Sequence, residues 1–402
     1  MDRRKFLESS LYTLGALGVG PALASRISAD DRIGIGVIGT GVRGQQLLEF
    51  LVAMPQFDVL ACCDVLPFRL EEAHAIAGRD ASADADYRHM LDDDRIDAVA
   101  VATHFSGHHR IVMDALDAGK HIYCEKSMIK GIPETLEVVE FARRRPELVF
   151  QTGFQYHSAP LYRAAAELVA SGELGEITAV DCQWNRNGDW RRPLPDPKWE
   201  RQINWRMYRE YSSGLVAELS AHQMDFCNWI LDSKVERISG VGGIDYWKDG
   251  RETYDNVHVV CRYASGVTAT FSSLTTNSLG SYRIAVLGKK GSIQLTTRKG
   301  WYSPEVADDP PPGGVDLVSG ASVTDGPGGA YWASDSAASY QIDASADDPT
   351  PNALNEFADA ISRGIAPNSN VFTGAKASIM VQLSLDAMDG EQVMRWKPAY
   401  DV

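Results

Sequence analysis

The sequence predicts an α/β protein with two domains: a doubly wound parallel sheet comes first, and an α+β domain with an open, mainly antiparallel sheet follows. Three observations predict this fold class. A glycine-rich turn joins an apolar strand to a helix near residue 40, and strands then alternate with helices to about residue 150. Beyond that point, alternating polar and apolar residues are typical of antiparallel strands. At 402 residues, the chain is long enough for two domains of ordinary size.

The first predicted elements are an apolar strand over residues 33–39 and the helix that follows it. The turn between them reads Gly39-Thr40-Gly41-Val42-Arg43-Gly44. In this G-x-G-x-x-G pattern, the first glycine permits the turn, the second lets the backbone approach a pyrophosphate, and the third lets the helix pack on the strand. The N-terminal NH groups of the helix favour an anion. We therefore expect a dinucleotide-binding domain of the Rossmann type over residues 31–150, with residues 39–44 at the cofactor.

The second predicted strand, residues 57–63, ends in an acid at the position where such domains bind the adenine ribose. Asp64 lies 20 residues beyond Gly44. A carboxylate there accepts hydrogen bonds from the ribose hydroxyls and repels a 2'-phosphate, which favours NAD. Arg69 could reach a 2'-phosphate from the same loop, so NADP is possible. The alternative for Asp64 is a turn residue at the end of a strand.

Two later strands, residues 98–102 and 122–124, are followed by polar side chains at the carboxyl edge of the predicted sheet. Thr103 follows the first strand, and Glu125 and Lys126 follow the second. Ligands bind at this edge in doubly wound sheets. A lysine there could donate to a substrate hydroxyl and stabilise the alkoxide, while Glu125 could orient the lysine or the ribose. The alternative is a surface ion pair.

In the second domain, residues 151–402, a predicted helix over residues 214–231 carries a possible general base. Glu218 and His222 are one helical turn apart and Asp225 follows three residues later, so a regular helix would place all three on one face. A carboxylate beside a histidine fixes its tautomer and stabilises the imidazolium. The alternatives are a core histidine and half of a metal site. Glu-x-x-x-His supplies only two ligands, so we expect no metal.

Candidate substrate contacts follow the first predicted strand of the second domain. Residues 184–206 are dense in Trp, Arg and Asn. Aromatic faces stack on sugar rings, and Arg and Asn bind hydroxyls or carboxylates. The alternative is a solvated loop with structural ion pairs. Side chains that we expect at the substrate are Tyr156, Asn185, Arg186, Trp205 and His222, and His157 could also face the cleft.

These residues together resemble the Gfo/Idh/MocA oxidoreductase family, from Ile33 to about Gly291. The run Ala118-Gly119-Lys120-His121-Ile122-Tyr123-Cys124-Glu125-Lys126 is similar to the family's strand that ends in Glu-Lys-Pro. Glu218 and His222 match its Asp-x-x-x-His motif, and Thr103 and His108 fall where the family has Thr-Pro-Asn and a histidine. The resemblance implies that Lys126 and His222 are the catalytic pair and Glu218 the supporting acid.

The same resemblance implies further cofactor contacts and an assembly state. Thr103, His104, His108, Glu125 and Lys126 would lie beside the cofactor, and dimers or tetramers would form through the exposed face of the open sheet. Three residues depart from the family pattern: Ser127 and His104 each stand in place of a proline, and Glu218 stands in place of an aspartate. These departures predict a branch with different substrate geometry.

Composition limits the remaining possibilities. Lys and Arg number 39 against 54 Asp and Glu, and this net charge of -15 opposes binding to nucleic acid or to anionic membranes. The N-terminal residues 1–30 combine Arg3-Arg4-Lys5-Phe6-Leu7 with a short apolar segment that ends in Ala-Leu-Ala. This pattern predicts a twin-arginine signal peptide, export to the periplasm and no membrane span after processing. Residues 303–350 predict an irregular excursion, and residues 351–402 predict closing helices.

The sequence therefore predicts an exported NAD(P)-dependent oxidoreductase. It would transfer hydride between a nicotinamide cofactor and a secondary alcohol or ketone of a sugar, polyol or glycoside. Because an exported enzyme lacks a free nicotinamide pool, we expect a tightly bound cofactor. The alternatives are a redox-assisted glycoside hydrolase or lyase that uses tightly bound NAD, and a non-catalytic sugar or nucleotide sensor.

Overall fold

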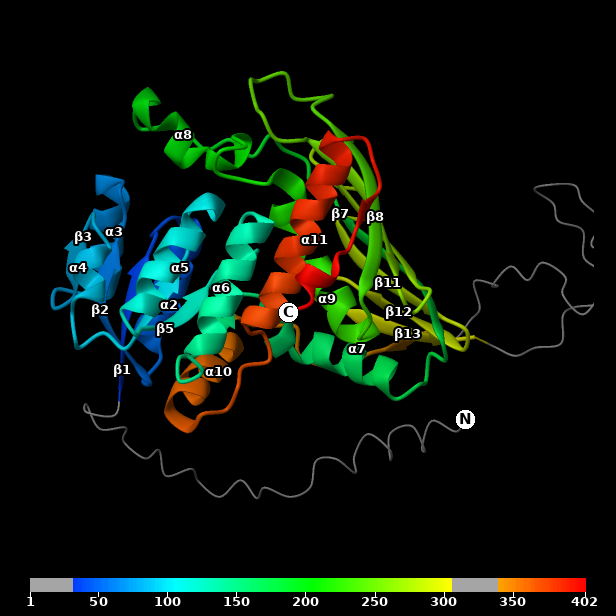
Figure 1. Ribbon diagram of the computed structural model, residues 1–402, viewed down its shortest axis with the longest axis horizontal. Coiled ribbons are helices and arrows are strands. Elements are labelled where there is room, and N and C mark those ends of the chain that lie inside the picture. The colour runs from blue at the N-terminus through cyan, green and yellow to red at the C-terminus, as the bar shows by residue number, and fades with distance from the viewer. Residues whose placement is uncertain (1–31, 306–338) are drawn as a thin grey trace, which may run out of the picture. The chain divides into compact units, whose positions relative to one another are not determined.

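The structure, a computed structural model, describes residues 32–305 and 339–402. The predicted signal peptide and most of the predicted excursion over residues 303–350 lie outside the described residues. The described residues from Ile33 onward belong to one compact unit (Figure 1). Within the described ranges, no helix combines the length and the apolar character needed to cross a membrane.

The first sheet confirms the predicted doubly wound class. Its six parallel strands have the order β3-β2-β1-β4-β5-β6, so the order reverses between β1 and β4. The strands are β1 (Ile33–Ile38), β2 (Phe57–Cys63), β3 (Ser82–Asp84), β4 (Ala98–Val101), β5 (His121–Cys124) and β6 (Phe150–Thr152). The sequence analysis missed β3, because this short edge strand is polar and largely exposed. Ligands bind at such a reversal, outside the carboxyl ends of the strands.

Helices cover both faces of the first sheet. On one face lie α2 (Val42–Ala53), α3 (Pro67–Ala77) and α10 (Thr350–Arg363), packed through an apolar cluster that includes Leu47 and Phe357. On the other lie α5 (His108–Asp117), α6 (Ile132–Arg144) and the start of α11 (Val371–Asp389). The short α4 (Arg88–Leu91) precedes β4. Helix α10 thus belongs to the core of the first sheet, although the sequence analysis grouped it with the second domain.

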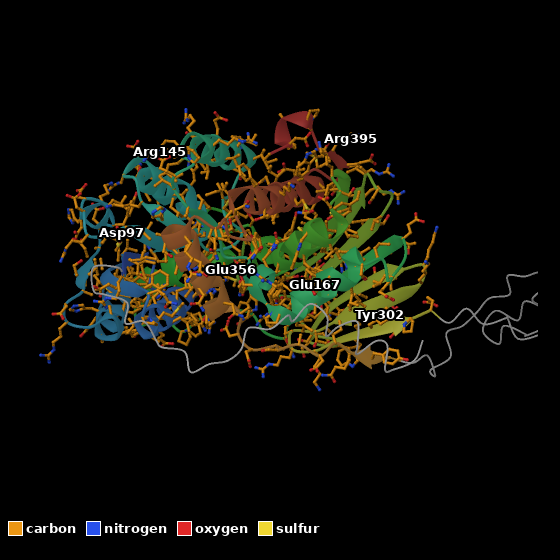
Figure 2. The ribbon with its side chains drawn as sticks, turned by 90° about the horizontal axis from the view of Figure 1, so that it is seen from below. Asp97, Arg145, Glu167, Tyr302, Glu356 and Arg395 are labelled. Carbon is orange, nitrogen blue, oxygen red and sulfur yellow. The ribbon has the colours of Figure 1, made fainter. Side chains whose placement is uncertain are left out.

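The second sheet is open and mainly antiparallel, as predicted. Its nine strands have the order β14-β13-β12-β11-β7-β10-β9-β8-β15, and only the pair β7 and β10 is parallel among the described pairs. The strands are β7 (Ile177–Trp184), β8 (Val235–Gly243), β9 (Asn256–Tyr263), β10 (Thr268–Leu274), β11 (Tyr282–Gly288), β12 (Gly291–Leu295), β13 (Gly300–Pro304), β14 (Tyr340–Gln341) and β15 (Met394–Arg395). Figure 2 shows the two sheets side by side.

One face of the second sheet is buried and the other is open. On β9, Val257, Val259 and Cys261 are buried, whereas His258 and Val260 are exposed. The buried face packs against α11, α7 (Pro160–Ala170) and α9 (Ala221–Leu231). This alternation is the period-two pattern that a sheet with one covered face requires.

Between β7 and α9 the chain makes a long excursion that extends over the first domain (Figure 1). It contains the short helix α8 (Glu200–Ile203) and ends in a π-helical turn, η6 (Val216–Ser220). The sequence pattern predicted one regular helix over residues 214–231, whereas the π-helical turn changes the direction in which the Glu218 side chain points. The 3-10 turns are η2 (Phe105–Gly107), η3 (Gln155–Ser158), η4 (Pro197–Trp199), η5 (Trp205–Met207) and η7 (Pro398–Tyr400).

Candidate active site

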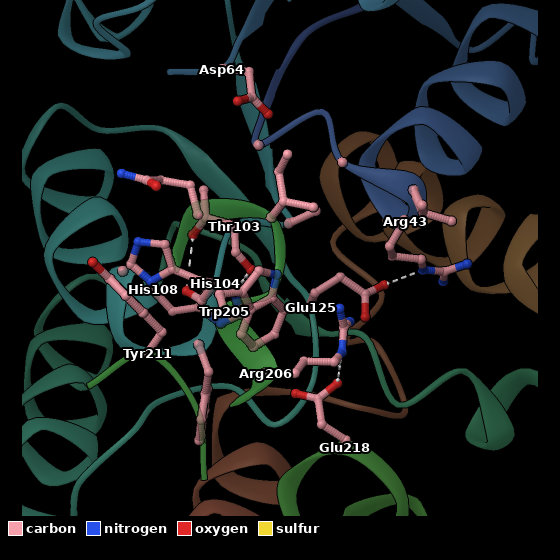
Figure 3. A pocket seen from close by; sticks show the side chains of 18 of the residues that line it. Arg43, Asp64, Thr103, His104, His108, Glu125, Trp205, Arg206, Tyr211 and Glu218 are labelled. Carbon is pink, nitrogen blue, oxygen red and sulfur yellow. Dashed lines mark hydrogen bonds and ion pairs between the residues drawn. The ribbon is translucent and has the colours of Figure 1, made fainter. Parts of the chain in front are cut away.

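A pocket of about 800 Å³ lies where the carboxyl edge of the first sheet meets the second domain (Figure 3). One wall comes from the turns that follow β1, β2, β4 and β5. The other comes from the excursion after β7 and from the π-helical turn. The pocket therefore runs without interruption from Gly39 and Asp64 to Lys126 and His222.

The glycine turn has the shape that a bound pyrophosphate needs. Gly39 has φ 87°, a conformation that favours glycine. A Cβ on Gly44 would lie 1.9 Å from the Gly39 carbonyl oxygen, so only glycine lets α2 begin this close to β1. Helix α2 has Gly41 as its N-cap and no side-chain cap, which leaves its first NH groups available to an anion. These residues fit a dinucleotide.

Asp64 supports the turn as well as lining the pocket. One carboxylate oxygen accepts from the Thr40 NH at 2.8 Å, and the other accepts from the Leu66 NH at 2.9 Å. Asp64 thus fixes the two loops relative to each other. Arg69 lies beside the turn, because its Nη1 is 3.2 Å from the position of a Cβ on Gly41. Val42, also in the pocket wall, is 61% exposed and open to a ligand.

Arg43, predicted at the cofactor, is turned toward Glu125. Its Nε donates to Glu125 Oε1 at 2.7 Å (Figure 3). Its terminal nitrogens donate to Thr350 Oγ1 at 3.2 Å. Burial acts to lower the pKa of Arg43, but the nearby Glu125 carboxylate more than reverses this and raises it. The ion pair leaves this part of the pocket wall without net charge, and Thr350, the first residue of α10, bonds to Arg43.

The turn after β4 places three of the predicted residues. Thr103 and His104 lie in the pocket wall. His108 is 2% exposed, with Nδ1 2.8 Å from the Met128 carbonyl and Nε2 3.2 Å from the Thr103 carbonyl. Both ring nitrogens of His108 face carbonyl groups of the protein, and the neutral ring donates to one of them, so this residue positions the loop next to Lys126.

His104 meets a side chain from the second domain. Its ring lies edge-on to Tyr211 with centroids 4.8 Å apart. Burial, followed by the neighbouring His108, lowers the pKa of His104 to about 4. The imidazole is thus neutral at pH 7, where it can donate or accept one hydrogen bond.

Lys126 is held by the π-helical turn of the other domain. Its Nζ donates to the Glu218 carbonyl at 2.9 Å and lies 3.8 Å from Glu218 Oε2. Ser127, joined to Lys126 by a cis peptide bond, donates from Oγ to the Ala217 carbonyl at 2.8 Å. Burial lowers the pKa of Lys126, and Glu218 partly opposes this. The widened turn supplies the carbonyl groups that fix the lysine.

The Glu218 carboxylate was predicted to pair with His222, but among the described residues it pairs with Arg206 and Lys126 instead. Its Oε2 accepts from Arg206 Nε at 2.7 Å (Figure 3). The π-helical turn changes the spacing of side chains on which the prediction of a common face rested. Burial acts to raise the pKa of Glu218, but the charges of Arg206 and Lys126 outweigh it and lower the pKa overall. The carboxylate is therefore charged. Glu218 therefore supports Lys126 and Arg206, and not the histidine.

His222 lies in the pocket wall among aromatic rings, and no carboxylate of the described residues pairs with it. Its ring centroid is 5.7 Å from that of Phe154, 4.9 Å from Tyr156 and 6.0 Å from Trp184. Nδ1 is buried and has no hydrogen-bond partner among the described residues. Burial, with the charge of Lys126, lowers the pKa of His222 well below its ordinary value. The neutral imidazole is ready to accept a proton from a ligand.

Three predicted substrate contacts are corrected by their placement outside the pocket wall. Tyr156 stacks on Tyr162 with ring centroids 4.1 Å apart and packs against the ring of His222. His157 pairs with Asp225 at 2.9 Å in the core. Asn185 is 8% exposed, donates to the Leu279 carbonyl and accepts from the Leu274 NH, so it closes a sheet turn. Sequence order alone did not show which side of β7 and η3 these side chains take.

The excursion after β7 supplies the rest of the wall, including residues that the predicted site omitted. Arg186 and Trp205 lie in this wall, and Arg192, Arg206 and Tyr211 of the excursion join them, together with Trp184 at the end of β7. The density of Trp and Arg in this part of the sequence indicated that such side chains would line the pocket. Arg191 anchors the excursion, because its Nε donates to Asp249 at 3.0 Å and its Nη1 pairs with Glu200. Arg251 adds a bond to the same Asp249 carboxylate at 2.7 Å.

Comparisons with known proteins agree with this architecture. The family description "Oxidoreductase family, NAD-binding Rossmann fold" matches residues 33–154, and "GFO/IDH/MocA C-terminal domain" matches residues 162–294. The inositol 2-dehydrogenase/D-chiro-inositol 3-dehydrogenase of Lactiplantibacillus plantarum is 25% identical over 206 residues, which is 51% of this chain and 54% of that protein. The myo-inositol 2-dehydrogenase of Thermotoga maritima is 26% identical over 64% of this chain and 74% of that protein.

Solved structures share the fold. Levoglucosan dehydrogenase in complex with NADH and levoglucosan has a TM-score of 0.71 at 19% identity, covering 90% of this chain and 99% of that chain. A myo-inositol 2-dehydrogenase from Lactobacillus plantarum has a TM-score of 0.69 at 17% identity, covering 91% and 100%. Lys126 and His222 fall in the two matched domains, one in each. The chain belongs to the Gfo/Idh/MocA family of NAD(P)-dependent oxidoreductases.

Proposed function

We propose that this protein is a dehydrogenase that oxidises a secondary alcohol of a sugar, polyol or glycoside, or reduces the corresponding ketone. The observation that carries the proposal is the placement of Lys126 and His222 in one pocket that continues to the glycine turn. The names of its relatives support the substrate class, since they include inositol and levoglucosan dehydrogenases.

The two residues have complementary tasks. When bound, the nicotinamide accepts hydride from the alcohol carbon or returns it to the ketone. His222 takes the hydroxyl proton on its neutral imidazole, so the alcohol loses one hydride and one proton and becomes a ketone. Lys126 donates a hydrogen bond to the developing alkoxide, and Glu218 keeps the ammonium in place at 3.8 Å. Burial and the charge of Lys126 hold the pKa of His222 well below 6.5, so the imidazole is neutral and available as a proton acceptor at pH 7.

The bound cofactor is proposed to be NAD, held tightly. Asp64 occupies the end of β2, where a carboxylate repels a 2'-phosphate. Arg69 from the first domain lies beside Gly41, and Arg192 from the excursion lines the same pocket. A dinucleotide bound there would contact cations from both domains, and charge-assisted hydrogen bonds from both would strengthen its binding.

A two-part experiment tests the proposal. The purified protein is denatured and the released nucleotide identified by mass, which distinguishes NAD from NADP and from an empty site. The native protein is then supplied with NAD or NADP and a panel of inositols, hexoses, anhydrosugars and glycosides. We expect formation of reduced nicotinamide and a ketose. A protein that binds neither dinucleotide would contradict the proposal. Glycoside cleavage without accumulation of reduced nicotinamide would instead identify the redox-assisted hydrolase or lyase.

We also propose export by the predicted twin-arginine signal and assembly through the open face of the second sheet. The exposed side chains Val241, Val260 and Leu287, on β8, β9 and β11, are apolar positions on an otherwise largely polar face. Fractionation of cells that carry the full chain or an Arg3→Lys, Arg4→Lys variant tests export, which the variant should block. Light scattering with Val260→Lys tests assembly, which that variant should weaken.

A further inference from the structure

The main pocket is positively charged although the chain is strongly acidic. The chain has a formal net charge of -15. In contrast, seven Lys and Arg side chains but only three Asp and Glu side chains line the pocket. A pocket whose charge opposes that of the whole protein concentrates anions. The dinucleotide is one such anion, so the question is whether its phosphates account for all of the excess.

Several of the cations already have acidic partners. Arg43 pairs with Glu125, Arg191 pairs with Asp249 and Glu200, and Arg206 pairs with Glu218. Of the remaining cations, Arg69 lies beside the glycine turn, with Nη1 3.2 Å from the position that a Cβ on Gly41 would take. Arg192 lies near Arg69: after the larger effect of burial, repulsion from Arg192 contributes to the lowered pKa of Arg69. These two are on the pyrophosphate side.

Arg186 is on the other side, toward His222. Its guanidinium carbon lies 5.4 Å above the Trp184 ring, and the Trp184 ring lies 6.0 Å from the ring of His222. No described carboxylate forms an ion pair with Arg186. Burial lowers its pKa, the nearby Tyr156 opposes this, and repulsion from Arg206 adds to the lowering. The guanidinium therefore lies in a cationic neighbourhood, next to an aromatic platform and close to the proposed base.

We propose that the substrate is an acidic sugar whose carboxylate binds Arg186 while its ring rests on Trp184 and its reacting hydroxyl faces His222. This inference rests on the proposed function. A guanidinium matches a carboxylate with two parallel hydrogen bonds, and an indole face matches the CH surface of a sugar ring. Trp184 ends β7 and Arg186 follows two residues later, with its guanidinium carbon 5.4 Å from the indole ring, so one sugar can contact both groups.

Binding measurements test the inference separately from turnover. Calorimetry on the NADH-loaded full chain would compare D-glucuronate with D-glucose and D-galacturonate with D-galactose. Removal of a charge-assisted pair weakens binding roughly 10- to 100-fold. We expect the wild type to bind one uronate about that much more tightly than its neutral partner, and Arg186→Gln to abolish the difference. Arg298→Gln is the matched control, because it removes the same charge from an exposed position outside the pocket.

Each outcome decides the inference. Equal or tighter binding of both neutral sugars, no binding of either uronate, or an unchanged ratio in Arg186→Gln would overturn it. Tighter binding of D-glucose 6-sulfate than of D-glucuronate would overturn the assignment of a carboxylate. Oxidation of neutral sugars without any preference for uronates would support the proposed function and overturn the inference. Binding of a uronate that depends on Arg186, without hydride transfer, would support the inference and contradict the proposed function.

Discussion

The two walls of the pocket are built in different ways. The wall from the first domain is fixed by main-chain hydrogen bonds close to the sheet: the Gly39 NH donates to the Cys63 carbonyl at 2.8 Å, and the Thr40 NH donates to Asp64 at 2.8 Å. The wall from the second domain has no long helix or strand between β7 and η6. Side-chain ion pairs hold it instead, notably Arg191 and Arg251 on Asp249.

This difference separates cofactor binding from substrate selection. The first wall is rigid and offers backbone NH groups, which recognise a phosphate whatever the substrate is. The second wall presents aromatic and basic side chains on an irregular segment, where substitutions change specificity without changing the fold. Lys126 joins the two, because it follows β5 but is held by the Glu218 carbonyl. The predictions below test this division, beginning with the residues at the junction.

The largest effect is expected at the catalytic pair. Lys126→Met or His222→Gln should lower kcat roughly 100- to 10,000-fold, since each removes a group that acts on the moving proton or the alkoxide. Steady-state kinetics and NADH titration would measure this. NADH affinity should remain within a few-fold, because the glycine turn is untouched. Activity close to that of the wild type in both variants would exclude the proposed mechanism.

The next largest effect is expected in the first wall. Gly44→Ala places a Cβ 1.9 Å from the Gly39 carbonyl oxygen, so α2 must shift away from β1. Overpacking of this kind costs about 1–3 kcal/mol. Thermal unfolding should show the loss of stability, and NADH binding should weaken in the protein that remains folded. A variant with unchanged Tm and unchanged NADH affinity would show that close packing of the turn is not required.

A smaller effect is expected in the second wall. Asp249→Asn removes the charge on which Arg191 and Arg251 converge, at 3.0 and 2.7 Å. Loss of hydrogen bonds to a charged group costs roughly 1–3 kcal/mol, part of which falls on the placement of the excursion. KM for the substrate should rise while kcat changes little. If the variant instead lowered kcat with KM unchanged, the excursion would contribute to the chemistry and not to selection.

The smallest expected effect is on how activity depends on pH, because the pKa values of His222 and Lys126 are both shifted from their ordinary values. The reaction in the oxidative direction needs neutral His222, whose pKa lies well below 6.5, so kcat/KM should stay level as the pH falls through 6.5. It also needs protonated Lys126, whose pKa is lowered from 10.5, so activity should fall at a pH below 10.5 on the alkaline side. Lys126→Arg should move this alkaline limb upward. An acid limb centred at 6.5 would show that His222 is as hydrated as a free histidine.

The sequence was sufficient for the first wall because its residues are close in the chain. Gly39 to Gly44 and Asp64 belong to one strand, turn, helix and strand, whose geometry fixes their positions. The classes of both sheets were also predicted, but the short polar strand β3 and several strands of the second sheet were not. The second wall could not be predicted to the same degree. Asn185 and Tyr156 were placed by sequence order, but contacts with Leu279 and Tyr162 turn them away from the pocket.

Glu218 illustrates the same limit within a helix. Its predicted contact with His222 assumed regular helical spacing, whereas the π-helical turn directs its carboxylate to Arg206 at 2.7 Å. Nothing in the local sequence distinguishes a π-helical turn from an α-helical one. Such turns depend on the tertiary contacts that they make, here those with Lys126 and Ser127.

Hydride transfer within the pocket can be measured directly by isotope. The protein is incubated with uniformly C-deuterated sugars from the panel, then denatured, and the nucleotide is analysed by mass. The proposed function predicts a nucleotide that gains one deuterium in the wild type and none in His222→Gln with the same occupancy. A nucleotide that is bound but never labelled, with every sugar of the panel, would contradict the assignment of this pocket as a dehydrogenase site.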